Sequence, residues 1–379
     1  MLTSVGIANF KSLKSVLLNT RHLNLLTGLN GSGKSSLIQA LLLLRQSPDI
    51  GQGRLLLKNP GNDLFDAGVA EDAYFQSGIE KYIYFNLGLS DAFTFSWHFA
   101  CDPIAEPEAT VLNAPERYFD EVMYRSALFT DAFQYLTAER TGPRSQYARS
   151  IEVVEGQRGL GNAGEYAVDF LYRFGSEWKV TAPGMRHPDA KSDLLIHQAE
   201  AWLSEISPGV QVEATPLSNE DIRLSFQFST TRGKTTPIKP KNVGFGLTYV
   251  LPVILAALSA EPGKLILIEN PESHIHPRGQ VELGRLLAAC AQSGAQLFVE
   301  THSDHILNGL RLATREKLIE PDKAVAFYFR REEEDNCTNI TPIVLDEKAK
   351  LHRQTPDGTT AQLPKGFFDQ WTSSMAKLF

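Results

Sequence analysis

The chain has 379 residues, of which 42% are hydrophobic and 21% are charged, and it carries a net charge of −7. This length is enough for two lobes with separate cores. The acidic balance excludes a global basic field that would attract nucleic acid, and it leaves room only for a local basic groove.

Cysteine usage and hydropathy indicate the cellular compartment. Cys101, Cys290 and Cys337 form no CxxC pair, and their odd number argues against a disulfide framework, so we expect buried, reduced thiols. The N-terminal stretch lacks the apolar segment of a signal peptide. The longest apolar runs fall short of the roughly 20 residues that a membrane helix needs. We therefore expect a cytoplasmic protein with no membrane partner.

The most informative stretch follows two short expected strands at the N-terminus. Leu23–Gly28 is an apolar run typical of a buried strand, and residues 28–35 read GLNGSGKS, which fits the phosphate-binding pattern G-x-x-x-x-G-K-[ST]. The next residues, to about Gln46, favour a helix because they include no Gly or Pro. The strand–loop–helix order favours a P-loop over a Gly/Ser turn that binds nothing. Lys34 would reach the β- and γ-phosphates, and Ser35 would hold Mg²⁺. The predicted ATP-binding residues of the loop are Asn30, Gly31, Ser32, Gly33, Lys34, Ser35 and Ser36.

The middle of the chain predicts a second lobe inserted into the first. Alternating runs between about residues 53 and 101 indicate antiparallel strands. A helix is expected near Glu121–Phe133, and two more within 163–174 and 193–206. Residues 209–217 and 221–230 are typical of a strand pair. The loop after this pair carries four cations that either track a phosphate backbone or form a solvated hairpin: Arg232, Lys234, Lys239 and Lys241.

From residue 243 the pattern changes to alternating helices and strands. An apolar helix starts at a glycine pair, and KLILIEN and QLFVETHS read as buried strands that each precede a helix. This alternation predicts a mostly parallel sheet, which we expect the P-loop strand to join, in an α/β fold. The predicted segments are 1–101 and 243–320 for the two parts of a nucleotide-binding head, 102–242 for the inserted helical and β lobe, and 321–379 for a C-terminal segment.

A second half of the site is predicted at the ends of these strands. A P-loop needs a carboxylate at the end of another buried strand to hold Mg²⁺, and Glu269 follows four apolar residues. His302 ends the next strand, where it either contacts the γ-phosphate and its attacking water or caps a loop. His274 and His276 lie near Glu269 and Glu272, which raises a metal cluster as an alternative that we rank below an interface loop.

The motif set resembles the ABC-type ATPases of the RecF, SMC and OLD group. The stretches ANFKSL, LNLLTGLNGSGKSSLIQALLLLRQS, VGFGLTYVLPVI, LILIENPESHIHP and VETHSDHIL occur in the expected order. YLTAERTGPR, GNAGEYAVDFL and the ending LPKGFFDQW are similar to one bacterial subfamily of AAA-annotated ATPases with a C-terminal domain of unknown function. The resemblance implies an ABC-type ATPase head with a mixed or parallel core sheet, an antiparallel β lobe and an inserted helical lobe.

The resemblance also implies roles for individual residues. In such ATPases two heads sandwich two ATP molecules, each held between the P-loop of one head and a signature segment of the other. Glu269 would be the Walker B acid, a ligand of Mg²⁺ together with Ser35, and His302 the switch histidine. Lys11 and Ser12, with Asn9, match a segment that flanks the nucleotide, whereas Gln39 and Gln46 look like helix residues, so no glutamine loop is placed. The trans signature would be Gly244, Phe245 and Gly246, and the dimer-interface loop would contain Ser273, His274 and His276.

Two departures from that pattern matter. Glycine replaces the signature serine, although a helix N-terminus still attracts an anion. Asn270 stands where a catalytic glutamate is usual, and an amide can orient water but cannot accept its proton. Losing a general base typically costs roughly 10²–10⁴-fold in rate. We expect slow hydrolysis, with Glu272 or His302 as substitutes for the missing base.

The expected function is therefore an ATP-driven switch that forms a homodimer or higher oligomer on ATP and controls a separate nuclease or toxin, in DNA-related anti-phage defence or repair. A non-catalytic ATP-binding scaffold and a transporter ATPase subunit are the alternatives. Arg140 and Arg144 either sense nucleotide or brace the fold. The GFFDQW segment either packs on the head or anchors a partner, and DNA binding stays open.

Overall fold

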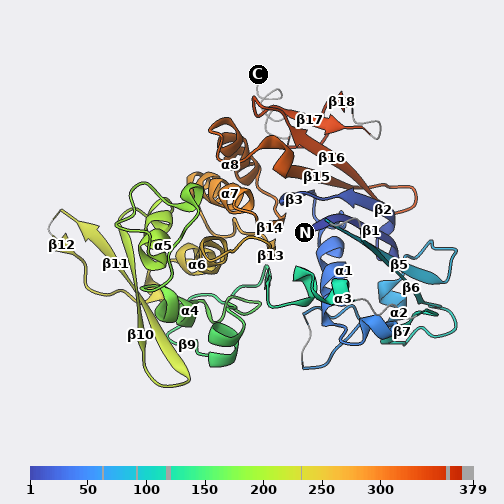
Figure 1. The fold of residues 1–379 in the computed structure, drawn as a ribbon, viewed down its shortest axis with the longest axis horizontal. Coiled ribbons are helices and arrows are strands. Elements are labelled where there is room, and N and C mark those ends of the chain that lie inside the picture. Colours follow the sequence, from blue (N-terminus) through green and yellow to red (C-terminus); the bar gives the residue numbers. More distant parts are fainter. Residues whose placement is uncertain (62–63, 91–92, 117–120, 232, 356–358, 369–379) are drawn as a thin grey trace. The chain divides into compact units, whose positions relative to one another are not determined.

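The computed structural model describes residues 1–61, 64–90, 93–116, 121–231, 233–355 and 359–368. The chain forms two compact units, whose helices and strands are labelled in Figure 1. The first unit comprises Met1–Thr130, Val325–Val344 and Leu351–Phe379, and the second comprises Asp131–Ala324 and Leu345–Lys350. The finer division at residues 101, 242 and 320 stays a prediction.

The first unit contains a six-stranded antiparallel sheet in the order β2-β1-β5-β6-β7-β4. In β6, Phe95, Trp97 and Phe99 are buried on one face while the residues between them are more exposed, which is the period of two that a sheet with one covered face requires. The antiparallel strands expected before residue 101 are confirmed. Their bounds are β1 (Leu2–Phe10), β2 (Leu13–Asn19), β4 (Arg54–Leu56), β5 (Tyr82–Leu89), β6 (Thr94–Ala100) and β7 (Val111–Asn113).

The P-loop strand of the first unit lies beside the C-terminal strands, in the order β18-β17-β16-β15-β3. The helix after the loop is a core helix, because all four leucines of Leu41–Leu44 are buried. The predicted strand, loop and helix order is confirmed. The bounds are β3 (Leu23–Gly28), β15 (Ala324–Arg331), β16 (Thr338–Leu345), β17 (Leu351–Gln354), β18 (Thr360–Ala361), α1 (Lys34–Gln46), α2 (Ala70–Ala73) and α3 (Glu121–Tyr124).

The second unit has a parallel run of three strands, in which β13 pairs with β14 and with β8. Leu265–Ile268 is buried throughout, as a strand covered on both faces should be. Figure 1 shows α7 and α8 side by side, and they pack on each other. The bounds are β8 (Phe133–Leu136), β13 (Leu265–Glu269), β14 (Gln296–Glu300), α4 (Ala167–Phe174), α5 (Leu195–Ser204), α6 (Phe245–Leu258), α7 (Pro277–Gln292) and α8 (Asp304–Arg315).

A second sheet of this unit contains the expected strand pair. β11 pairs antiparallel with β10, β12 and β9, which gives the long hairpin seen in Figure 1. The bounds are β9 (Tyr147–Ala148), β10 (Val210–Pro216), β11 (Asp221–Thr230) and β12 (Gly233–Lys234). Short 3₁₀ turns cover Ile50–Gln52, Ala127–Phe129, Pro183–Met185, Pro240–Asn242 and Pro321–Lys323, and Glu152–Gly156 is a π-turn.

One predicted helix was wrong in extent. The helix expected over Glu121–Phe133 ends at Tyr124, and Phe133 begins β8 instead. Pairing with β13 overrides the helical pattern, and Gln134 becomes tolerable in this buried strand because its amide group donates to the carbonyls of Tyr135 and Gly161. The expectation for the thiols also needs correction, since Cys101 and Cys290 are buried but Cys337 is only half-buried.

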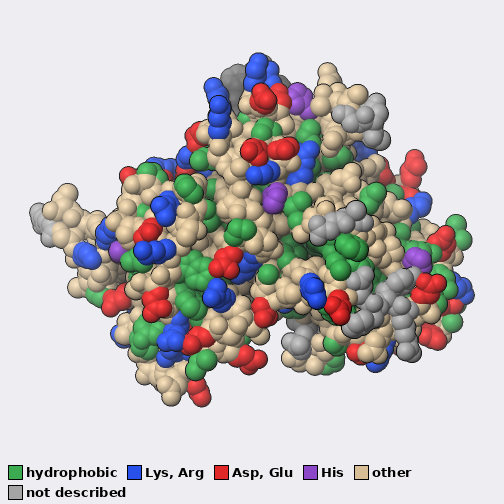
Figure 2. All heavy atoms as spheres, in the orientation of Figure 1, with side chains coloured by type: hydrophobic (Ala, Val, Ile, Leu, Met, Phe, Trp, Pro, Cys, Tyr) green, Lys and Arg blue, Asp and Glu red, His purple; other side chains and the backbone are tan. Residues whose placement is uncertain are grey.

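Acidic and basic side chains are interspersed over the face of the molecule shown in Figure 2, in keeping with a modest net charge. None of the helices within the described ranges combines the length and the apolarity that crossing a bilayer requires.

Candidate functional site

The P-loop between β3 and α1 has the backbone of an anion cradle. Gly28, Gly31 and Gly33 all have positive φ, at 142°, 73° and 96°. Gly33 has no room for a side chain, because a Cβ there would lie 2.4 Å from the Thr338 hydroxyl. Only glycine meets both conditions at this position.

Charge around the start of α1 also suits an anion. Gly33 is the N-cap residue, no side chain caps the helix, and its first turn has no acidic residue. The N–H groups and the positive end of the helix dipole therefore favour a bound phosphate. The Lys34 ammonium donates to the carbonyls of Gly28 at 3.1 Å and Leu29 at 2.8 Å, which holds it over the loop.

The other predicted P-loop residues differ in their exposure to solvent. Asn30 and Gly31 are exposed and Ser35 is half-buried, so these three are open to a ligand. Ser32 and Ser36 are buried. The Ser32 hydroxyl has no hydrogen-bond partner within the described residues, and a phosphate oxygen is one group that could satisfy it.

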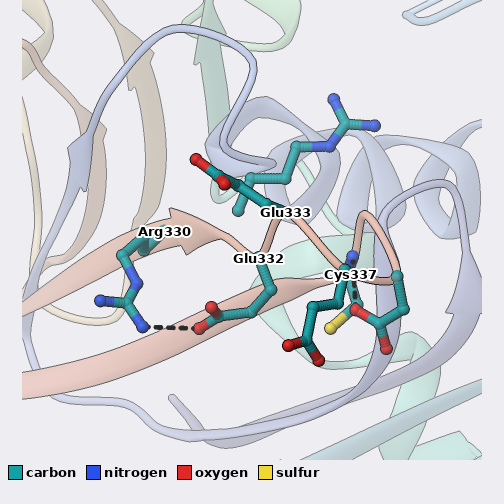
Figure 3. Close-up of a pocket in the computed structure, with 7 residues that line it drawn as sticks. Arg330, Glu332, Glu333 and Cys337 are labelled. Atoms are coloured by element: carbon teal, nitrogen blue, oxygen red, sulfur yellow. Dashed lines mark hydrogen bonds and ion pairs between the residues drawn. The ribbon is translucent and has the colours of Figure 1, made fainter.

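The hairpin of β15 and β16 braces the P-loop, which no sequence pattern indicates. The Thr338 hydroxyl donates to the Ser32 carbonyl at 3.0 Å and lies 2.8 Å from the Ser12 hydroxyl. The Arg331 guanidinium donates to the Gly31 carbonyl at 3.3 Å. Figure 3 shows the acidic tip of this hairpin, where Arg330 pairs with Glu332 at 2.8 Å. Only long-range pairing brings these residues to the loop, so no local motif reveals them.

Lys11 and Ser12, which the resemblance places beside the nucleotide, make different contacts. Ser12 contacts the P-loop brace through Thr338. The Lys11 ammonium instead donates to Gln39 of α1 at 3.0 Å and lies 4.5 Å from the ring centre of Phe65, and burial lowers its pKa. Gln39 and Gln46 both lie in α1 as expected, and the Gln46 amide is hydrogen-bonded to the backbone of Leu56, Leu64 and Phe65.

In the second unit, Glu269 ends β13 with both carboxylate oxygens occupied. Tyr135 Oη donates to one oxygen at 3.1 Å, and the backbone N–H of Ala138 donates to the other at 3.2 Å. Burial raises the pKa of the Glu269 carboxyl, against the lowering effect of these bonds and of nearby Arg140. A carboxylate in this position is oriented but poorly solvated, so a bound cation would stabilise its ionised form.

Arg140 fixes the backbone around this acid. It is 3% exposed, and its guanidinium donates to four carbonyls: those of Thr137, Tyr249, Glu269 and Asn270, at 3.1, 3.0, 2.6 and 2.6 Å. Burial lowers its pKa to about 10. These contacts favour the bracing role over nucleotide sensing, because nearly all of its five N–H donors are used within the fold.

The residues after Glu269 hold polar atoms that the fold leaves unsatisfied. Asn270 has a φ of 44° and its amide oxygen is buried without a partner within the described residues. One oxygen of Glu272 accepts from the His302 backbone N–H at 2.8 Å, and the other is buried and unpaired in the same part of the chain. His302 itself is exposed. The second unit thus brings Glu269, Asn270, Glu272 and His302 to one end of the parallel strands.

The start of α6 and the loop before α7 are in contact. Gly246 approaches the loop closely, since a Cβ there would lie 2.5 Å from the His274 carbonyl oxygen. The His274 ring lies 4.7 Å from that of Tyr249 and 5.7 Å from that of Phe245, which is 58% exposed. No side chain caps α6 at Gly244. His276 caps α7 by accepting from the Arg278 N–H at 3.3 Å, and the Ser273 N–H donates to the Asn270 carbonyl at 3.2 Å.

The basic loop and the GFFDQW segment, two further candidates from the sequence, lie partly outside the described residues. Lys234, Lys239 and Lys241 are exposed, and Arg232 lies outside the described residues. Phe367 packs edge-on against Tyr328 of β15, with ring centres 5.5 Å apart, whereas residues 369–371 of the GFFDQW segment lie outside the described residues.

These features define an α/β protein of the P-loop NTPase class, and the predicted fold class is confirmed. Residues 23–99 and 106–308 match the family described as "AAA domain, putative AbiEii toxin, Type IV TA system". The matched residues make up most of the chain, and the chain belongs to this family. No curated protein matches it.

Solved structures with a similar fold include heads of SMC proteins. The chain is similar to an SMC head bound to the C-winged helix domain of ScpA (13% identity, TM-score 0.49, 92% of this chain and 99% of that one). It is also similar to the SMC head domain from Thermotoga maritima (12%, 0.42, 90% and 98%). A third is an SMC head with an extended coiled coil, bound to the C-terminal domain of ScpA derived from Pyrococcus furiosus (12%, 0.48, 91% and 96%).

Proposed function

We propose that this protein is a cytoplasmic ATP-binding switch that dimerises around Mg²⁺–ATP, hydrolyses ATP slowly and controls a partner effector. The observation that carries the proposal is the P-loop cradle. Its positive-φ glycines, the uncapped start of α1 and the Lys34 ammonium over the loop all favour a polyphosphate. Membership of an AAA-domain family supports the same ligand.

Mg²⁺ would neutralise charge on the β- and γ-phosphates. The Ser35 hydroxyl and the Glu269 carboxylate are its proposed protein ligands. Glu269 fits this role because its carboxylate is oriented by two donors while burial raises its pKa, so a cation would offset the cost of its charge.

Slow turnover follows from Asn270. An amide cannot accept the proton of the attacking water. The unpaired oxygen of Glu272 and the exposed ring of His302 are the proposed groups that orient or deprotonate water in place of a glutamate at 270. We expect Asn270→Glu to raise turnover by about 10²-fold or more.

The turnover test uses phosphate release at saturating ATP. Lys34→Ala is the control and should abolish ATP binding. Glu272→Gln and His302→Ala should each lower the residual rate. Brisk wild-type hydrolysis that survives both substitutions would refute the slow-switch proposal.

Dimerisation is proposed to use the start of α6 and the loop before α7. Gly244, Phe245 and Gly246 would approach the phosphates bound by a second copy, with Ser273, His274 and His276 at the same interface. The exposed Phe245 ring beside His274 is an apolar surface that a second copy would cover. Light scattering should show a dimer or higher oligomer with ATP for Glu272→Gln, and a monomer at saturating ATP would count against the proposal.

A non-catalytic ATP-binding scaffold is the second candidate. It is favoured by Asn270 together with the engagement of one Glu272 oxygen by the His302 backbone. ATP-dependent dimerisation of wild type without measurable turnover, unchanged in Asn270→Glu, would favour the scaffold over the enzyme.

The biological role is proposed from the family. Its description names a putative toxin of a type IV toxin–antitoxin system, which supports a role controlled by a partner. We propose DNA-related anti-phage defence or repair as the setting of that role. The effector would be a nuclease or toxin. Phage plating on cells that carry the gene with its neighbours, with Lys34→Ala as control, tests the role. DNA binding that falls on replacing Lys234, Lys239 and Lys241 by Glu would establish DNA as a partner.

A further inference from the structure

The second unit contains a small pocket at the amino ends of β8 and β13, with a volume of about 240 Å³. Its lining comes from the residues just before the two strands, the end of α6, the turn at 156–158, and aromatic side chains of α4 and the loop after it. Glu269 lies at the other end of β13, which at ~3.3 Å per residue is roughly 16 Å away. The pocket is therefore separate from the strand ends discussed above.

Lys264 is the unusual member of this lining. It is half-buried, and its ammonium has no hydrogen bond or ion pair to any residue in the described part of the chain. Burial lowers its pKa, against the weaker raising effects of Cys290 and Glu261. An unmatched, poorly hydrated cation is costly for the folded state, and an anion from outside would offset that cost.

Two aromatic side chains also line the pocket. Phe170 is fully buried and Trp178 is half-buried, with ring centres 6.4 Å apart. The Arg158 guanidinium lies 5.4 Å from the Trp178 ring centre and pairs with Glu261 at 3.4 Å. Asp131 and Glu261 also line the pocket, and because Glu261 pairs with Arg158, the Lys264 ammonium is the cation of this lining that no ion pair within the described residues engages.

The volume limits the ligand. A space of 240 Å³ is about eight times the roughly 30 Å³ that a water molecule occupies in the liquid. It is below the ~300–1,000 Å³ of sites for drug-sized ligands. A nucleoside triphosphate is too large, whereas one aromatic ring with an acidic group fits.

We propose that this pocket binds a small aromatic anion, whose ring lies against Trp178 and whose carboxylate or phosphate pairs with the ammonium of Lys264. The site is independent of the proposed ATP site. A ligand bound there would contact the carboxyl end of α6 and the start of β13.

The test uses two anionic probes, phenyl phosphate and benzoate, with benzyl alcohol and benzylamine as neutral and cationic controls. Isothermal titration should give a submillimolar Kd for at least one anion with the wild-type protein. Lys264→Met, which keeps the apolar stem and removes the charge, should weaken binding by roughly tenfold or more. Lys348→Met, which removes an exposed lysine of the same unit, is the matched control and should leave the Kd unchanged.

A second variant blocks the pocket without touching the charge. No atom lies within 4 Å of a Cβ built on Gly156, so Gly156→Leu can place its side chain in the pocket without disturbing its neighbours. It should abolish binding, and it decides the question if Lys264→Met fails to fold. The proposal is overturned if neither anion binds wild type, if benzyl alcohol binds as tightly as phenyl phosphate, or if Lys264→Met or Gly156→Leu binds like wild type.

Discussion

Replacing Arg140 by Met tests whether this buried arginine braces the fold or senses nucleotide. The substitution removes four charge-assisted hydrogen bonds, which at ~1.5 kcal/mol each represent about 6 kcal/mol. It also relieves the burial of a guanidinium whose pKa is lowered to about 10, a relief of about 3 kcal/mol. The expected net loss in the free energy of unfolding is therefore about 3 kcal/mol, or a fall in Tm of roughly 4 °C for a chain of this length.

The matched control is Arg144→Met, four residues along the chain and exposed, which should change stability by less than about 0.5 kcal/mol. Thermal unfolding of the nucleotide-free proteins and titration of a fluorescent ATP analogue provide the two measurements. The reasoning is refuted if Arg140→Met unfolds at the same temperature as Arg144→Met but binds ATP at least tenfold more weakly, because Arg140 would then act on the ligand.

Three further predictions concern the P-loop of the first unit and the strand ends of the second. Gly33→Ala should lower the free energy of unfolding by about 1–2 kcal/mol, because alanine is strained at a φ of 96°. The new Cβ would also collide with the Thr338 hydroxyl, so binding of an ATP analogue should be lost. Wild-type affinity for the analogue would contradict the proposed phosphate cradle. Thr338→Val should weaken ATP binding and lower the free energy of unfolding by about 1–3 kcal/mol, because the Ser32 carbonyl loses its hydrogen-bond donor. Thr338→Ser keeps the hydroxyl and should behave like wild type in both measurements. If the two variants behave alike, the hydroxyl is not the cause. Glu269→Gln should raise the Tm of the nucleotide-free protein, and the gain should grow as the pH rises above the ordinary carboxyl pKa of 4.5. Burial raises the Glu269 pKa in the folded state, so its ionisation subtracts stability as the pH rises above the unfolded value; a gain independent of pH would exclude that cause.

Local patterns were sufficient to predict the elements that carry the proposed chemistry. The P-loop, β13 and α6 each combine a short-range motif with an apolar period, and the structure places them as expected. β8 was missed because FQYL is too short to distinguish from a helical turn, and only its pairing with β13 fixes it as a strand.

The residues that support the P-loop and the start of α6 could not be predicted from the sequence. Thr338 and Ser12 are more than 300 residues apart, and nothing in either neighbourhood indicates that they meet. Gly246 was assigned to a signature, whereas its contact with the His274 carbonyl gives a packing reason for the same glycine. Long-range contacts of this kind depend on how strands pair, which local propensity does not determine.

The backbone conformation of Asn270 adds a second reason for the residue that replaces the usual glutamate. At a φ of 44° asparagine is favoured over glutamate, because its short side chain is tolerated in the left-handed region. A glutamate there would cost about 1–2 kcal/mol. Restoring a general base is worth roughly 3–5 kcal/mol in the barrier, from a factor of 10²–10⁴. The catalytic gain exceeds the backbone cost, so the backbone conformation alone does not explain Asn270, which agrees with the slow turnover proposed above.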